Sequence, residues 1–167
     1  NGMRLIRIGE MSGGLSERAQ RIEQVWRDAG FNVRAFEDIQ QMVWEKFVCN
    51  VAVSAPTAAF DVTIGELHAD AELWHVAMGC MLEAHGIGLE RGVRFSFDDP
   101  LEHLAEFAAT IPDASPSMRL DHQARRRSEV DVINGAVVEL GRRMGRPTPY
   151  NEALVAVLHA REVTFPD

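Results

Sequence analysis

Three polar side chains recur along an otherwise apolar stretch of the sequence, residues 41–55. Lys46, Asn50 and Ser54 are spaced four residues apart, so they form one row on a helix. The neighbouring rows are apolar, which predicts a largely buried helix. An ammonium group on such a helix must meet an anion, reach water or face a ligand. The spacing leaves two interpretations: the lysine stem packs while the ammonium reaches solvent, or the row faces a ligand.

A second group of polar residues falls between residues 115 and 145. Glu129 begins an otherwise apolar row at helical spacing. Its carboxylate could pair with Arg125 or Arg126, about one turn earlier, or point into a cleft, and the pattern does not decide between the two. Ser117 stands at a predicted helix start, where it could cap the helix, or where free N–H groups could favour a carboxylate ligand.

Three other features of the sequence suggest nucleotide, metal or thiol chemistry, but their spacing or context does not fit it. The segment 86–92 resembles a dinucleotide fingerprint, but it has one residue too many before its third glycine and follows a predicted helix. The six histidines include no H-x-x-x-H pair on one helix face and no HExxH motif, so the sequence predicts no metal. Cys49 and Cys80 lie in apolar helical contexts and are predicted to be buried free thiols.

The composition narrows the class of protein. A net charge of -8 over 167 residues argues against a nucleic-acid partner. No apolar stretch approaches the roughly 18 residues of a membrane span, and the first residues show no signal-peptide pattern. These features predict a cytoplasmic protein that binds neither nucleic acid nor membrane.

The first 36 residues predict a strand, a helix and a second strand. Residues 5–9 and 31–35 have strand patterns, and between them Ser16 can cap a helix that Gly30 ends. Two strands make a poor sheet by themselves. We therefore interpret this segment as the end of a larger α/β domain.

Residues 37–167 are predicted to be helical. Pro56 is expected to kink or end the helix that contains the polar row. A long helix is expected over residues 70–86, where glycines interrupt the pattern. One helical run is expected over residues 115–145, and Asn151 is expected to cap the last helix.

Four short motifs occur along the chain in a fixed order. They are Ile8-Gly9-Glu10 with Gly13-Gly14; Trp44-Glu45-Lys46-Phe47 with Asn50; Ser117-Met118 with Asp121, Arg126, Glu129 and Ile133-Asn134-Gly135; and Thr148-Pro149 with Asn151. The ordered set, which spans nearly the whole chain, resembles the ketopantoate reductase family, also called 2-dehydropantoate 2-reductases. The resemblance implies a mainly α fold for residues 37–167, a multi-helical C-terminal domain like that of 6-phosphogluconate dehydrogenase. Residues 1–36 would then be the remnant of a dinucleotide-binding domain.

The resemblance also implies an activity, the NADPH-dependent reduction of a 2-keto acid to a 2-hydroxy acid. The family's catalytic lysine falls on Lys46 and its active-site glutamate on Glu129. Its substrate-binding residues fall on Asn50 and Ser117, and on Ser54, where many members have a second asparagine. The shorter serine would enlarge or rewire the pocket, which leaves the identity of the 2-keto acid open.

The glycine-rich fingerprint of a dinucleotide domain does not occur in this sequence. The resemblance therefore implies that NADPH binds mostly outside these residues and that the isolated chain is inactive. It also implies a homodimer, and apolar residues of the first segment, such as Val25 and Trp26, would favour self-association. The alternative is a non-catalytic helical dimerisation or interaction module on the same scaffold.

Overall fold

The computed structural model describes residues 5–166, and the chain forms two compact units, residues 1–45 and 46–167. The domain boundary predicted at residues 36 and 37 lies just after the second strand, whereas the contacts divide the chain inside the helix that follows. The domain assignment stays a prediction. No helix among residues 5–166 is both long and apolar enough to cross a bilayer.

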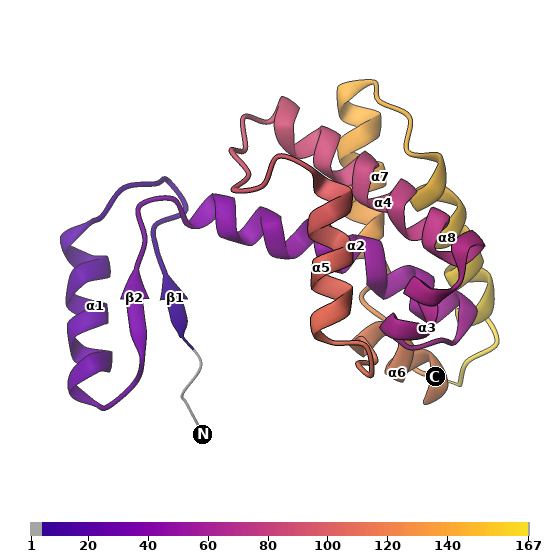
Figure 1. Ribbon diagram of the computed structural model, residues 1–167, viewed down its shortest axis with the longest axis horizontal. Helices are drawn as coiled ribbons and strands as arrows, with labels where there is room; N and C mark the ends of the chain where they lie inside the picture. Colours follow the sequence, from indigo (N-terminus) through magenta and orange to yellow (C-terminus); the bar gives the residue numbers. More distant parts are fainter. Residues whose placement is uncertain (1–4, 167) are drawn as a thin grey trace. The chain divides into compact units, whose positions relative to one another are not determined.

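In the first unit, one helix connects two parallel strands (Figure 1). β1 (Ile6–Ile8) pairs with β2 (Val33–Ala35), and α1 (Glu17–Asp28) lies between them in the sequence. The side chain of Ser16 caps α1 by accepting a hydrogen bond from the Ala19 N–H at 3.0 Å. The predicted strand-helix-strand order is confirmed.

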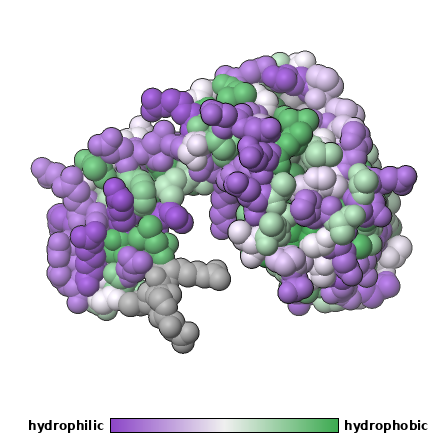
Figure 2. All heavy atoms as spheres, in the orientation of Figure 1, coloured by the Kyte–Doolittle hydropathy of each residue, from purple (hydrophilic) through white to green (hydrophobic). Residues whose placement is uncertain are grey.

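Large apolar side chains stay exposed on this unit. On α1 they include Val25, 65% exposed, and Trp26, 41% exposed, and Phe31 follows at 47%. Figure 2 shows hydrophobic atoms, in green, reaching the surface of the same unit. Because such clusters tend to be covered, self-association remains our expectation for this chain.

α2 (Ile39–Phe60) supplies the centre of the second unit. Val48, Cys49 and residues 51–58 are buried, which confirms the predicted burial of this helix. Pro56 does not end α2, which continues to Phe60, so that part of the expectation was wrong. Arg161 donates from Nη1 to the carbonyls of Ala58 and Ala59, at 2.6 and 3.1 Å. These bonds satisfy carbonyls that the C-terminal end of a helix leaves free.

The rest of the second unit is helical (Figure 1). α4 packs against α5, α7 and α8, and α7 packs against α8. The mainly helical fold with a short parallel two-stranded sheet confirms the predicted fold class. The remaining elements are α3 (Ile64–Ala69), α4 (Ala71–Glu90), α5 (Pro100–Thr110), α6 (Ser117–Gln123), the 3-10 turn η1 (Val130–Val132), α7 (Asn134–Met144) and α8 (Pro149–Glu162).

α4 runs through two glycines that were expected to interrupt it. Gly86 and Gly88 are helical, and only Gly92, with φ of 81°, ends the helix. The Val93 N–H donates to the Gly88 carbonyl at 3.0 Å, and the Gly92 N–H donates to the Leu89 carbonyl at 2.9 Å. This is the Schellman arrangement, in which a left-handed residue lets two N–H groups satisfy the last turn.

Two further expectations about helix ends were wrong. Residues 115–145 hold two helices and a 3-10 turn instead of one run, and Arg125 takes the left-handed φ of 54° after α6. Asn151 does not cap α8: the cap is Thr148, and Asn151 lies fully buried in the first turn. In both places distant residues hold the chain, as described below.

Gly79 in α4 allows the closest approach between two helices. A Cβ at this position would lie 2.5 Å from atoms of the Tyr150 ring on α8. We expect Gly79→Ala to lower the free energy of unfolding by about 1–3 kcal/mol, because overpacking shifts both helices. Gly86→Ala is the matched control: its Cβ would meet only the mobile end of Arg146, at 3.3 Å. That variant should be neutral or more stable by up to ~1 kcal/mol. Urea denaturation measures the free energy of unfolding of both variants. Equal changes in Gly79→Ala and Gly86→Ala would contradict the packing argument.

Candidate functional site

The polar row of α2 runs from the surface into the core. Lys46 is exposed, Asn50 is half-buried, and Ser54 is 4% exposed. Lys46 is also the only lysine in a chain with sixteen arginines. Every other Lys or Arg position of the chain is an arginine. This bias points to Lys46, and the spacing of the polar row did not reveal it.

The first two groups of the row are free of protein partners. Among residues 5–166, neither the Lys46 ammonium nor the Asn50 side-chain amide makes a hydrogen bond or an ion pair with another side chain or carbonyl. Both groups are therefore available to solvent or to a ligand. The exposure of Lys46 agrees with an ammonium in water, and both interpretations of the row stay open.

Ser117 and Glu129, twelve residues apart, are brought together. The Ser117 hydroxyl donates to Oε1 of Glu129 at 2.5 Å. Ser117 does not cap α6, whose cap position is Pro116. The pairing of Glu129 with an arginine is not observed either: Arg126 bonds Asp121, and Arg125 bonds the Thr164 carbonyl. The carboxylate of Glu129 is half-buried and meets a neutral hydroxyl.

A buried amide network fastens this region to α2. Asn134, at the start of α7, is fully buried and donates from Nδ2 to the Val51 carbonyl at 2.9 Å and to Oδ1 of Asn151 at 2.8 Å. Asn151 donates in turn to Oε2 of Glu83 at 2.6 Å. Glu83 also accepts the N–H groups of Tyr150 and Asn151 at the start of α8. The network therefore joins α2, α4, α7 and α8.

The turn before α7 connects Glu129 to a residue that is bonded to α2. The N–H groups of Val132 and Ile133 donate to the Glu129 carbonyl at 3.1 and 3.2 Å, so the turn is compact. Its far end, Asn134, bonds the carbonyl of Val51, the residue after Asn50. The structure thus ties the turn of Glu129 to the polar row, although no direct bond joins the Ser117–Glu129 pair to Lys46 or Asn50 among the described residues.

A second carboxylate holds the segment that leads into Glu129. Oε1 of Glu162, in α8, accepts from the Ser128 N–H at 2.9 Å and the Ser128 hydroxyl at 2.7 Å, and it lies 3.0 Å from Nε2 of His122. Burial raises the pKa of Glu162, but the hydrogen bonds from Ser128 and His122 outweigh it and hold the pKa below its ordinary value. Sequence reasoning missed Glu162, because its partners lie more than thirty residues away.

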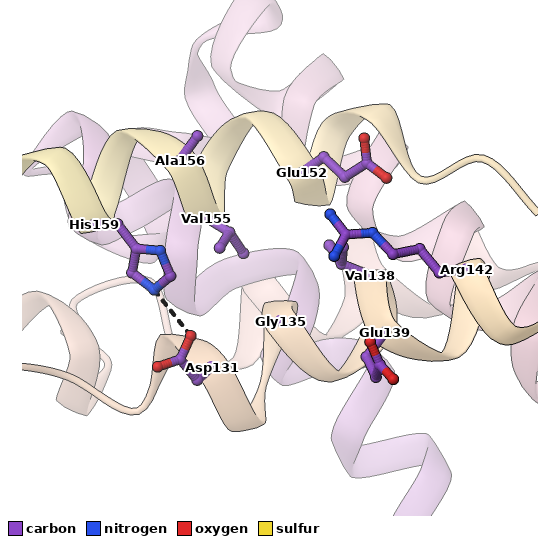
Figure 3. A pocket seen from close by; sticks show the side chains of 9 residues that line it. All are labelled: Asp131, Gly135, Val138, Glu139, Arg142, Glu152, Val155, Ala156 and His159. Carbon is purple, nitrogen blue, oxygen red and sulfur yellow. Dashed lines mark hydrogen bonds and ion pairs between the residues drawn. The ribbon is translucent and has the colours of Figure 1, made fainter.

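The groove between α7 and α8 is separate from these residues (Figure 3). Its volume is approximately 390 Å³, and Nε2 of His159 lies 2.9 Å from Oδ1 of Asp131 at one end. None of the predicted site residues lines it. Within residues 5–166, no three His, Cys, Asp or Glu side chains gather in a way that could hold a metal ion. The groove is lined by Asp131, Gly135, Val138, Glu139, Arg142, Glu152, Val155, Ala156 and His159.

The start of α1 does not suit the pyrophosphate of a dinucleotide. The Glu10 carboxylate already accepts hydrogen bonds from Arg18 and from the Ser16 hydroxyl at this helix end. The bonds from Arg18 and Ser16 hold the pKa of Glu10 below its ordinary value, so it is anionic at neutral pH. The Glu10 carboxylate, paired with Arg18, already occupies the helix end that would otherwise attract a phosphate.

Comparison with known proteins decides the family. Residues 38–162 match the family described as ketopantoate reductase PanE/ApbA, C terminal. The chain belongs to this family. A 2-dehydropantoate 2-reductase of Archaeoglobus fulgidus is 32% identical over 155 residues, which cover 93% of this chain and 52% of that protein. The chain thus spans about half the length of this ketopantoate reductase.

Solved structures share the fold. The ketopantoate reductase of Ralstonia eutropha JMP134 superposes with a TM-score of 0.85 at 25% identity, covering 97% of this chain and 52% of that one. A D-mandelate dehydrogenase solved with NADH gives 0.86 at 21% identity, with coverages of 99% and 57%. A ketopantoate reductase from Staphylococcus aureus, described as dimeric, gives 0.81 at 21% identity, with coverages of 95% and 54%.

Proposed function

We propose that this chain is the substrate-binding part of an NADPH-dependent reductase that converts a 2-keto acid to a 2-hydroxy acid, as 2-dehydropantoate 2-reductases do. The observation that carries the proposal is on α2. The only lysine of the chain lies in the region matched by the family, with its ammonium unpaired, one turn from the unpaired amide of Asn50. Because the chain spans about half the length of the curated relative, the activity belongs to the complete gene product.

Lys46 has the chemistry that the reduction of a ketone needs. Attack of a hydride on the keto carbon builds negative charge on the carbonyl oxygen. An ammonium group near that oxygen stabilises the charge and can deliver the proton that completes the alcohol. Arginine would do this poorly, because its guanidinium keeps its proton at any ordinary pH.

The other residues are assigned to binding and orientation. Asn50 would hydrogen-bond the hydroxyl or carboxylate of the substrate from the next turn of α2. The Ser117 hydroxyl, which donates to Glu129, keeps its lone pairs free to accept from a substrate hydroxyl. Glu129 would orient Ser117 and attract the Lys46 ammonium once substrate is bound. Ser54, at the buried end of the row, would shape the pocket floor.

The hydride itself would come from NADPH. We assign the residues named above to the substrate and propose that most of the cofactor site lies outside them. The D-mandelate dehydrogenase with the same fold was solved with NADH, so the test below compares both nicotinamide cofactors. We also propose a homodimer, for which light scattering of the chain at high concentration is the measurement.

The experiment is an assay of the complete gene product. We expect it to oxidise NADPH when supplied with 2-dehydropantoate or with another 2-keto acid, such as benzoylformate, and to form the matching 2-hydroxy acid. The relative rates across this panel identify the substrate, which Ser54 leaves open. A folded protein that turns over no 2-keto acid with either NADPH or NADH would overturn the proposal and favour a non-catalytic module.

A further inference from the structure

Arg119, which no motif singled out, makes three hydrogen bonds near the candidate site. It lies on α6, two residues after Ser117, and its side chain is 14% exposed. Its Nε donates to Oδ1 of Asp61 at 3.0 Å, its Nη2 to the Asp61 carbonyl at 3.2 Å, and its Nη1 to the Ser115 hydroxyl at 2.7 Å. All three nitrogens of the guanidinium are thus engaged.

Asp61 is the residue that directly follows α2. Its φ of 55° is left-handed, a conformation that directs the chain out of the helix. Its carboxylate accepts from Gln123 at 2.8 Å as well as from Arg119. The hydrogen bonds of Gln123 and Arg119 hold the pKa of Asp61 below its ordinary value, so the carboxylate is charged at neutral pH. Two residues of α6, Arg119 and Gln123, are therefore bonded to Asp61, directly after the C-terminal end of α2.

α6 needs such a connection because it is short. It spans 7 residues and has no side-chain cap, and helices of this length are not stable by themselves. The backbone before it is held by α3, where the Gly65 N–H donates to the Pro112 carbonyl at 2.7 Å and the Ile64 N–H to the Ala114 carbonyl at 3.1 Å. Arg119 supplies the remaining connection, to the helix that carries Lys46 and Asn50.

We infer that Arg119 is a positioning residue: by joining α6 to the end of α2 through Asp61, it places the Ser117 hydroxyl relative to the polar row. The inference rests on the proposed function, since it takes Ser117 to be a substrate-binding group. We assign Arg119 to positioning and not to substrate binding, because each nitrogen of its guanidinium already donates to Asp61 or Ser115. This connection needs a side chain that donates from several nitrogens in fixed directions, which the single ammonium of a lysine cannot do.

The test is a double-mutant cycle in the complete gene product. Arg119→Gln should raise KM for the 2-keto acid about fivefold to tenfold, as expected when one hydrogen bond to substrate is lost, with little change in kcat or in KM for NADPH. Ser117→Ala should raise the same KM by a similar factor. In the double variant the second change should add nothing, because Arg119 acts only through Ser117.

Three variants serve as controls. Arg119→Lys keeps the charge and the stem, so it should fold and still show the raised KM. Asp61→Asn keeps an oxygen acceptor and suits a left-handed residue, so it should remain within about twofold of the parent protein. Arg143→Gln removes an exposed surface arginine and should change nothing.

The outcomes separate the inference from the proposed function. Additive effects of Arg119→Gln and Ser117→Ala, or a normal KM in both Arg119 variants, would overturn the positioning role alone. A parent protein without 2-keto-acid reduction would overturn the proposed function and this inference together. A raised KM in Arg119→Lys with a normal KM in Ser117→Ala would show that Arg119 does not act through Ser117.

Discussion

Replacing Lys46 with alanine should lower kcat of the complete reductase by about 10²- to 10³-fold, the usual contribution of charge stabilisation and proton delivery, while KM for the 2-keto acid changes far less. The reason is that the ammonium acts mainly as charge develops on the carbonyl oxygen, so its loss is felt in the transition state. Steady-state kinetics with saturating NADPH measure both constants.

Two companion variants make the result specific. Asn50→Ala should act mainly through KM, because Asn50 is assigned to groups that do not react. Glu129→Ala should lower kcat and raise KM together, since it would both orient Ser117 and attract Lys46. If Lys46→Ala keeps a near-normal kcat, the lysine is only a solvent-exposed side chain and the assignment of the site fails.

Replacing Asn134 with alanine should have the largest effect on stability, a loss of about 2–4 kcal/mol in the free energy of unfolding. The side chain is fully buried and makes two hydrogen bonds, to Val51 and Asn151. Its removal opens a cavity and leaves the Oδ1 of Asn151 without that donor, and each effect typically costs ~1–3 kcal/mol.

Asn50→Ala is the control for this second prediction. Asn50 is half-buried and its amide has no partner among the described residues, so truncation should change stability by less than ~0.5 kcal/mol. Urea denaturation of the 167-residue chain measures both variants. Similar losses for Asn134→Ala and Asn50→Ala would contradict a structural role specific to Asn134.

The sequence predicted those features that depend on neighbouring residues. The cap at Ser16 and the burial of α2 follow from short-range patterns, and the structure has them. The ordered motifs led to the family, which the comparison confirmed. The polar row itself was visible from its spacing, because residues four apart on a helix are always neighbours.

What the sequence missed depends on residues far apart. The last turn of α2, after Pro56, is bonded by Arg161, which lies more than a hundred residues later in the chain. Asn151 looked like a cap, but Glu83 takes over the N–H groups at the start of α8 and leaves the amide for Asn134. Glu129 could not be assigned a partner, because Ser117 is twelve residues away. No local pattern encodes such pairs.

The solitary, exposed lysine has a practical consequence for studying this chain. An amine-directed reagent can modify only the side chain of Lys46 and the terminal amine, because every other cationic side chain, histidine aside, is a guanidinium. Reductive methylation with ¹³C-formaldehyde would therefore give a single side-chain resonance without mutagenesis. That resonance reports directly on whatever approaches α2 at this point, so the chain carries its own spectroscopic probe at the place where the chemistry is proposed.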